Sequence, residues 1–232
     1  MNTVKLSPSL MCADFIDMRS ALDVFQREGV DYLHIDIMDG HYVPNFTLGI
    51  DFCKAVARYT SIPLDIHLMI ENVDEYIPSF ASIGNALLSI HPETCYHPLR
   101  SLRLIKSSGA RAGIAIDPSM PLETYKHMLP EVDFVCIMTV NPGYAGQELI
   151  PQTIEKIREL SAHIDERGYD IEIEVDGNVS WKNIPVMVDA GADVLVAGTS
   201  SLFDKSGVLS DNLSRMRGML GQNKLSRVAS VC

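Results

Sequence analysis

Short apolar, β-branched segments recur along the whole chain, each followed by turn-forming residues. Segments of this length and composition are typical of buried strands. Segments with helical periodicity, such as 15–28 and 152–167, lie between most of them, and strands that alternate with helices predict a parallel sheet. We expect eight strands, over residues 5–10, 32–38, 63–69, 86–91, 110–116, 134–140, 171–176 and 193–197.

Eight fairly regular units favour a closed (β/α)8 TIM barrel over an open doubly wound sheet. The G-x-G-x-x-G pattern and the P-loop, which are typical of open sheets, do not follow the first strand. No linker or low-complexity segment divides the 232 residues, and barrels of this size fold as one domain. We therefore expect a single α/β domain over residues 1–220. The C-terminal tail over residues 221–232 shows no clear sequence pattern, and we expect that it is mobile.

Two kinds of residue mark the ends of the expected helices. Gly29, Gly84 and Gly191 each stand just before a strand, where glycine can end the preceding helix in the left-handed conformation. Asp14 lies before the first helical segment, and Pro151 suits the first turn of the sixth.

Charge and cysteine content exclude several kinds of partner and location. The formal net charge is −11 and the basic residues form no run, so nucleic acid and anionic membranes find no broad basic surface. A small anion can still bind to backbone N–H groups. The five cysteines are widely spaced without a C-x-x-C pair, and we find neither a signal peptide nor a membrane-spanning stretch. We expect a reduced, cytoplasmic protein.

Side chains that bind metals fall at the ends of three predicted strands. His34 and Asp36 are two residues apart and so share one face of their strand. His67 follows in the third strand. The seventh strand alternates acids with aliphatics, and its last inward acid, Asp176, reaches the carboxyl-terminal rim of the barrel.

A cation would explain why several carboxylates point into a barrel, because buried carboxylates are costly unless paired, protonated or metal-bound. Two imidazoles and two carboxylates suit Zn²⁺, Fe²⁺, Mn²⁺ or Co²⁺ better than Mg²⁺ or Ca²⁺. Each residue alone could be a satisfied core residue, but the four together favour a metal site. Asp65 and Met69 share the face of His67, and we interpret Met38, Met69 and Met138 as barrel filler.

Glycine-containing loops follow strands six, seven and eight. Glycine lets backbone amides approach an anion closely, and the loops after strands seven and eight often hold phosphate in this fold. The sequence therefore predicts a phosphate site at one rim, from residues 141–147 with Gly177, Asn178, Gly198, Thr199 and Ser200.

At these residues the chain resembles the ribulose-phosphate 3-epimerase family. The matching blocks, which run in order across almost the whole barrel, are residues 9–14, 34–45, 65–69, 140–147 and 174–177.

The resemblance implies one divalent metal per chain, with Zn²⁺ favoured, bound by His34, Asp36, His67 and Asp176. It implies that Asp36 and Asp176 are also the two acid/base groups, on opposite faces of a sugar phosphate. It further implies a homo-oligomer and a set of substrate contacts: Ser9, His67, Gly143, Tyr144, Ala145, Gly146, Gly177, Asn178, Gly198, Thr199 and Ser200.

A few positions depart from the pentose-phosphate pattern. Ala145 and Asn178 stand where glycines are usual, and residues 198–203 replace a more usual Gly-Ser. With residues 91–94, these look more like the D-allulose-6-phosphate 3-epimerase branch. We therefore expect interconversion of D-allulose 6-phosphate and D-fructose 6-phosphate, with D-ribulose 5-phosphate and D-xylulose 5-phosphate as the alternative pair.

Inversion at C3 of a 2-ketose phosphate requires removal of a proton α to a carbonyl and its return from the opposite face, through an enediolate. Two aspartates suit that reaction.

A phosphate-binding barrel lyase is an alternative function, but such an enzyme usually needs a lysine at the end of a strand. Here Lys5 opens the first strand, and the other lysines of the predicted barrel fall in helices or loops. A non-catalytic metal-binding barrel is a second alternative. The absence of one of the two aspartates would have favoured it, but Asp36 and Asp176 are both present.

Overall fold

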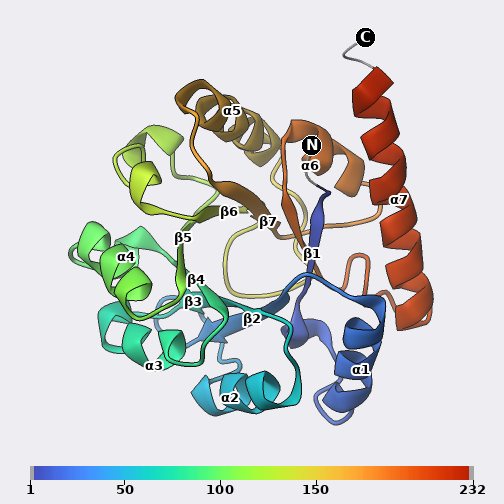
Figure 1. Ribbon diagram of the computed structural model, residues 1–232, viewed down its shortest axis with the longest axis horizontal. Helices are drawn as coiled ribbons and strands as arrows, with labels where there is room; N and C mark the ends of the chain where they lie inside the picture. Colours follow the sequence, from blue (N-terminus) through green and yellow to red (C-terminus); the bar gives the residue numbers. More distant parts are fainter. Residues whose placement is uncertain (1–2, 230–232) are drawn as a thin grey trace.

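Eight parallel strands form the centre of the molecule (Figure 1), and each is hydrogen-bonded to its neighbours in the order β1-β8-β7-β6-β5-β4-β3-β2. The computed structural model describes residues 3–229, with side chains for residues 3–221. A parallel bridge between Ser9 and His34 joins the first strand to the second and closes the barrel. The strands are β1 (Lys5–Pro8), β2 (Leu33–Met38), β3 (Leu64–Met69), β4 (Ala86–Ile90), β5 (Arg111–Ile116), β6 (Phe134–Met138), β7 (Glu172–Asp176) and β8 (Val194–Ala197).

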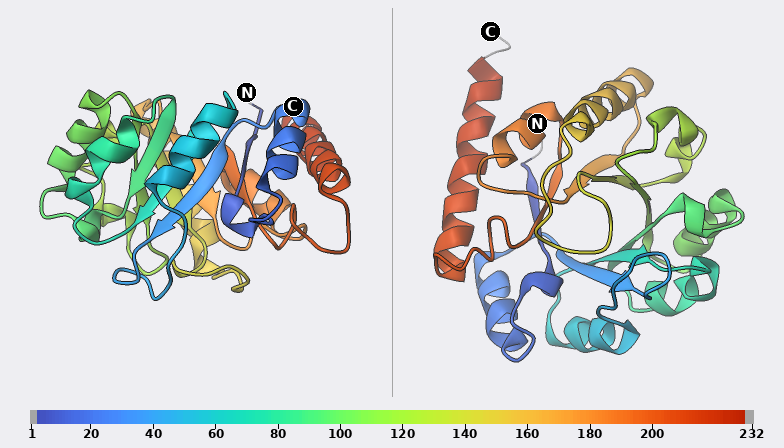
Figure 2. Two further views of the ribbon diagram at one scale, coloured as in Figure 1. Left: turned by 90° about the horizontal axis from the view of Figure 1, so that it is seen from below. Right: turned by 180° about the vertical axis from the view of Figure 1, so that it is seen from behind.

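Helices surround the strands as an outer ring (Figures 1 and 2). Outward aliphatics such as Ile35, Ile66 and Leu88 are fully buried against them, which accounts for the apolar runs in the sequence. The predicted TIM barrel is confirmed. Among the described residues, no helix is both long and apolar enough to cross a membrane. The helices are α1 (Met18–Glu28), α2 (Ile50–Tyr59), α3 (Ile77–Ala81), α4 (Pro98–Ser107), α5 (Gln152–Arg167), α6 (Ile184–Ala190) and α7 (Leu209–Ala229).

The connection between β5 and β6 differs from the other crossovers. Within this described segment, only two short 3₁₀ turns form, at Leu122–Thr124 and Leu129–Glu131. Pro118, Pro121 and Pro130 lie in the same stretch. Each proline removes a backbone donor and disfavours helical geometry in the residue before it, which limits the length of any helix in this stretch.

Helix ends follow the glycine signals more closely than the aspartate signal. Gly29 and Gly191 end α1 and α6 in the left-handed conformation, with φ of 63° and 119°. Helix α1 begins at Met18, later than the predicted residue 15. The Asp14 carboxylate accepts a hydrogen bond from the backbone N–H of Ile16 instead, which forms a turn before the helix.

Helix α7 packs beside α1 and α6 on the outside of the barrel (Figure 1), and Arg217 donates a hydrogen bond of 2.9 Å to the carbonyl of Gly29. The helix continues to Ala229, so regular structure extends past residue 221, where we expected a tail without pattern. The end of that predicted tail, residues 230–232, lies outside the described residues. Its mobility stays a prediction.

Candidate active site

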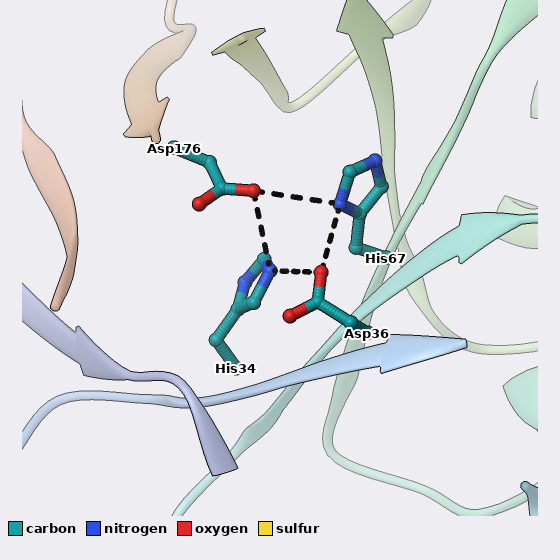
Figure 3. Close-up of side chains that lie close together, drawn as sticks. All are labelled: His34, Asp36, His67 and Asp176. Atoms are coloured by element: carbon teal, nitrogen blue, oxygen red, sulfur yellow. Dashed lines mark hydrogen bonds and ion pairs between the residues drawn. The ribbon is translucent and has the colours of Figure 1, made fainter. Parts of the chain in front are cut away.

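Four side chains predicted as metal ligands meet at the carboxyl-terminal end of the barrel (Figure 3). His34 and Asp36 come from β2 and His67 from β3, and the strand register places Asp36 opposite His67. Asp176 is the last residue of β7. His34, Asp36 and His67 are buried, whereas the Asp176 side chain is 17% exposed and faces the open end.

The donor atoms form a ring whose size suits a metal ion. The His34 Nε2 atom lies 3.2 Å from Asp36 Oδ1 and 3.8 Å from Asp176 Oδ2, and His67 Nδ1 lies 3.4 Å and 3.8 Å from the same two oxygens. Ligands about 2.0–2.2 Å from one tetrahedral ion are about 3.3–3.6 Å apart. Within the described part of the chain, buried His67 Nδ1 has no hydrogen-bond partner. The donor set therefore fits a divalent cation.

The imidazole of His34 is oriented by a hydrogen bond at Nδ1, the ring nitrogen that does not face the metal site. Its Nδ1 donates a hydrogen bond of 2.7 Å to Asp65 Oδ2. The same oxygen also accepts a hydrogen bond of 2.8 Å from Ser7 Oγ. A histidine that donates from one nitrogen offers the lone pair of the other to a metal, and such partners raise its basicity. The sequence placed Asp65 on this face of β3 but did not indicate this contact.

In the metal-free protein, the charges around His34 favour its protonated form, with a proton on the nitrogen that would bind a metal. Burial opposes the charged form of His34, but Asp65 and Asp36 outweigh it and hold the His34 pKa well above its ordinary value. Burial would likewise raise the pKa of Asp36, yet the charge of His34 keeps that pKa below its ordinary range. Burial raises the pKa of Asp176 to about 6. An incoming cation must therefore displace the proton of His34.

A cavity opens beside the cluster, and Asp36 and Asp176 both contribute to its wall. The Ser9 hydroxyl lies on the same wall and donates 3.2 Å to Asp36 Oδ2. Of the predicted substrate contacts, His67 alone does not line the cavity, because it is buried behind the aspartates. The residues that do line it are Ser9, Gly143, Tyr144, Ala145, Gly146, Gly177, Asn178, Gly198, Thr199 and Ser200.

Of the four methionines on the wall of this cavity, three come from barrel strands. Met38, Met69 and Met138 are buried residues of β2, β3 and β6. The sequence suggested that they only fill the barrel, but they also form an apolar surface against which the carbon chain of a ligand can pack. Among the residues with described side chains, no lysine lines the cavity, which argues against a Schiff-base lyase.

The loops at the cavity rim have backbone that only glycine adopts readily. Gly143, Gly146 and Gly177 have φ of 128°, 86° and 108°. A Cβ at Gly177 would lie 2.6 Å from Val140 Cγ2 and 2.9 Å from Val140 N, so no side chain fits there. Asn178 Nδ2 donates 2.5 Å to the carbonyl of Gln147 and joins the loops after β7 and β6. Such a surface exposes backbone amides to an anion.

A further set of polar side chains reaches the cluster from behind and was not identified from the sequence. His91, fully buried after β4, contacts His67, and Tyr42 and Glu93 contact His91. Glu174 is buried beside Asp65, and its pKa is raised well above the ordinary value by burial and by the charge of Asp65. The position of His91 at the end of a strand was the available signal.

Comparison with known proteins decides the family. The model of the ribulose-phosphate 3 epimerase family matches residues 5–203. This chain belongs to the ribulose-phosphate 3-epimerase family. It is therefore an isomerase, an epimerase acting on a sugar phosphate.

Two relatives within this family are particularly similar. The ribulose-phosphate 3-epimerase of Bacillus subtilis is 43% identical over 198 residues, which cover 85% of this chain and 91% of the relative. The ribulose-phosphate 3-epimerase of Escherichia coli is 41% identical over 206 residues, which cover 88% of this chain and 91% of the relative. The prediction of the family is confirmed. These relatives do not support the narrower assignment to the allulose-6-phosphate branch, and they favour the alternative substrate pair.

Solved structures with low identity support the fold alone. A tryptophan synthase alpha-subunit from Pyrococcus furiosus superposes with a TM-score of 0.63 at 16% identity, over 96% of this chain and 97% of that chain.

Proposed function

We propose that this protein is a metal-dependent D-ribulose-5-phosphate 3-epimerase, which interconverts D-ribulose 5-phosphate and D-xylulose 5-phosphate. The observation that carries the proposal is the meeting of Asp36 and Asp176, from β2 and β7, on the wall of a cavity rimmed by glycine loops. The names of the relatives at 41–43% identity support the pentose phosphate over the hexose phosphate that the sequence first suggested.

The reaction exchanges the proton on C3, which is acidic because it is α to the C2 carbonyl. One aspartate accepts this proton, and the other returns a proton from the opposite face of the planar enediolate, which inverts the carbon. The two carboxylates come from β2 and β7, which are separated in the barrel by β1 and β8, and this separation supports one acid/base group for each face of the substrate. In the metal-free protein, burial raises the pKa of Asp176 to about 6, so this carboxyl takes up a proton more readily than an exposed aspartate.

His34, Asp36, His67 and Asp176 would hold one divalent metal ion, with Zn²⁺ as the first candidate and Fe²⁺, Mn²⁺ and Co²⁺ as alternatives. Such an ion supplies Lewis-acid stabilisation of the negative charge that develops on the substrate oxygens. Ser9, which donates to Asp36, orients that carboxylate toward the cavity. The buried methionines exclude water from the reacting carbon.

The phosphate would bind at the glycine loops over Gly143–Gly146, Gly177–Asn178 and Gly198–Ser200. Backbone amides in these loops can bind a dianion without a lysine or arginine, and none lines the cavity among the described side chains. Binding there fixes the distance from the phosphate to C3 and so holds C3 near the two aspartates.

The test is the rate of epimerisation of D-ribulose 5-phosphate and of D-allulose 6-phosphate by the purified protein, before chelation, after chelation and after Zn²⁺ is restored. We expect kcat/KM to be at least about tenfold higher for the pentose phosphate, with loss on chelation and recovery with metal. A faster rate with D-allulose 6-phosphate would instead assign the hexose branch. The absence of turnover of both substrates by the metal-loaded protein would refute the epimerase proposal.

A further inference from the structure

His91 lies directly behind a predicted metal ligand without being one. It follows the last residue of β4, is fully buried and does not line the cavity. Its Nε2 lies 2.9 Å from Nε2 of His67, and the two rings stack with centroids 5.0 Å apart. Nδ1 of His67, the other ring nitrogen, is the atom that faces Asp36 and Asp176 (Figure 3).

The hydrogen bonds continue from His91 toward the surface. His91 Nδ1 lies 2.9 Å from the Tyr42 hydroxyl, which comes from the loop after β2. The same hydroxyl lies 2.7 Å from Glu93 Oε1. The Glu93 side chain is 37% exposed, so the series runs from the buried metal ligand to the edge of solvent.

Glu93 determines the direction of every hydrogen bond in this series. Burial acts to raise the pKa of Glu93, but hydrogen bonds from His91 and Tyr42 outweigh it and the pKa lies below its ordinary value. An ionised carboxylate can only accept, so the single hydroxyl proton of Tyr42 points to Glu93. The Tyr42 oxygen must then accept from His91 Nδ1–H, because it has no second proton.

The tautomer of His67 follows from this direction. Fully buried His91, with its one ring proton on Nδ1, has a lone pair on Nε2 that lies 2.9 Å from Nε2 of His67. The Nε2 of His91 then accepts from His67 Nε2–H. His67 is left with a lone pair on Nδ1, the atom that lies in the ring of metal donors.

We propose that His91 is a positioning residue for the metal site, and that Tyr42 and Glu93 set its tautomer so that His67 presents the Nδ1 lone pair to the cation. This inference rests on the metal site of the proposed function. In this proposal, His91 orients His67 in the way that Asp65 orients His34. Loss of such a partner typically weakens metal binding about 10- to 100-fold.

The first experiment measures Zn²⁺ dissociation constants by competition with a chelator for the wild type and four variants. We expect Glu93→Gln and Tyr42→Phe to weaken binding about tenfold, because the direction of the hydrogen bonds is no longer fixed. His91→Met should weaken it most, and His91→Gln, whose amide oxygen can accept from His67, should recover part of the loss. Glu71→Gln is the matched control, an exposed acid near Glu93 for which we expect no change.

The second experiment reads the tautomers directly, by long-range ¹H–¹⁵N NMR of the imidazoles in the Zn²⁺-loaded wild type. We expect the proton of His67 on Nε2 and that of His91 on Nδ1. A His67 proton on Nδ1, or equal Zn²⁺ affinity in the wild type, Glu93→Gln and His91→Met, would overturn the inference while leaving an active epimerase. A wild type that binds no Zn²⁺ and turns over no substrate would instead overturn the proposed function, and this inference with it.

Glu93 and Tyr42 keep the proposal testable if changes at buried His91 prevent folding. Both residues are partly exposed, so Glu93→Gln and Tyr42→Phe remove only polar contacts at the edge of the molecule. Circular dichroism of each variant before metal is added separates loss of the fold from loss of metal affinity.

Discussion

At the scale of single residues, His34 has the most constrained environment of the site. It lies between Asp36 and Asp65, 3.2 Å and 2.7 Å away, and the two carboxylates stabilise its protonated form. A cation at Nε2 and a proton at Nε2 exclude each other, so metal binding is linked to pH.

This linkage predicts the pH dependence of metal affinity. The His34 pKa in the metal-free protein lies well above its ordinary value of 6.5, so at pH 6 to 7 each bound ion displaces a proton. Zn²⁺ affinity should rise at least about tenfold per pH unit over that range, because Asp176, with a pKa of about 6, also loses its proton there, and it should level off above the raised pKa of His34. Chelator competition at several pH values, corrected for the protonation of the chelator, measures this. An affinity that does not change with pH would contradict it.

The two aspartates make separable contributions to proton transfer. Asp36→Asn and Asp176→Asn each keep an oxygen donor but remove one acid/base group, so each should lower kcat by at least about 10³-fold. In deuterated water, the aspartate that remains should still exchange the C3 hydrogen of one epimer only, and the two variants should exchange opposite epimers. NMR of the recovered sugar phosphates measures the label. Exchange of the same epimer by both variants would exclude a base on each face.

The ligand residues could be predicted from the sequence, whereas their support could not. His34, Asp36 and Asp176 were located because alternate residues of a strand share a face. The contact of His91 with Tyr42 joins residues 49 positions apart and depends on side-chain rotamers and loop paths. No periodicity encodes such a contact.

At the scale of elements, the glycine loops after the strands test the phosphate site. Gly177→Ala should raise KM about 10- to 100-fold, because a misplaced loop loses at least one hydrogen bond to a charged group, worth about 1.5–3 kcal/mol. The control is Gly168→Ala, at the end of α5, where φ is also positive, 63°, but no atom lies within 4 Å of the new Cβ.

Gly168→Ala should cost about 1–2 kcal/mol of unfolding free energy and leave KM unchanged. Steady-state kinetics and urea denaturation of both variants measure the two effects. Equal KM values for Gly177→Ala and the wild type would show that this loop does not hold the phosphate.

The elements themselves were largely predictable. Each predicted strand overlaps an observed one, and helix α5 has the predicted bounds of Gln152–Arg167, because a long amphipathic segment with a left-handed glycine after it has few alternatives. No helix was named for the crossover from β5 to β6, where Pro118, Pro121 and Pro130 limit helical hydrogen bonding and only short 3₁₀ turns form.

At the scale of the whole molecule, three strands from distant parts of the sequence contribute to one cluster of candidate metal ligands. A cation bound to β2, β3 and β7 together links elements that separate on unfolding, and it has no equivalent site in the unfolded chain. Metal binding therefore adds to the stability of the barrel as a unit. The predicted homo-oligomer and cytoplasmic location stay predictions.

The thermal stability of the barrel should depend on the metal. Zn²⁺ at 100 times its dissociation constant adds about 2.7 kcal/mol to the free energy of unfolding, which corresponds to a rise in Tm of about 5–10 °C for a chain of this size. Differential scanning calorimetry with and without chelator measures the shift. His67→Asn, which loses an imidazole ligand, should show a smaller shift, and an unchanged Tm in the wild type would contradict a site shared by three strands.

The central claim is that Asp36 and Asp176 epimerise a pentose phosphate at C3 through proton exchange. It is tested most directly by converting D-ribulose 5-phosphate in deuterated water with the metal-loaded protein and locating deuterium in the product by NMR. We predict D-xylulose 5-phosphate with deuterium at C3, and no conversion after chelation. Product without deuterium at C3, or no product from fully loaded protein, would contradict the account.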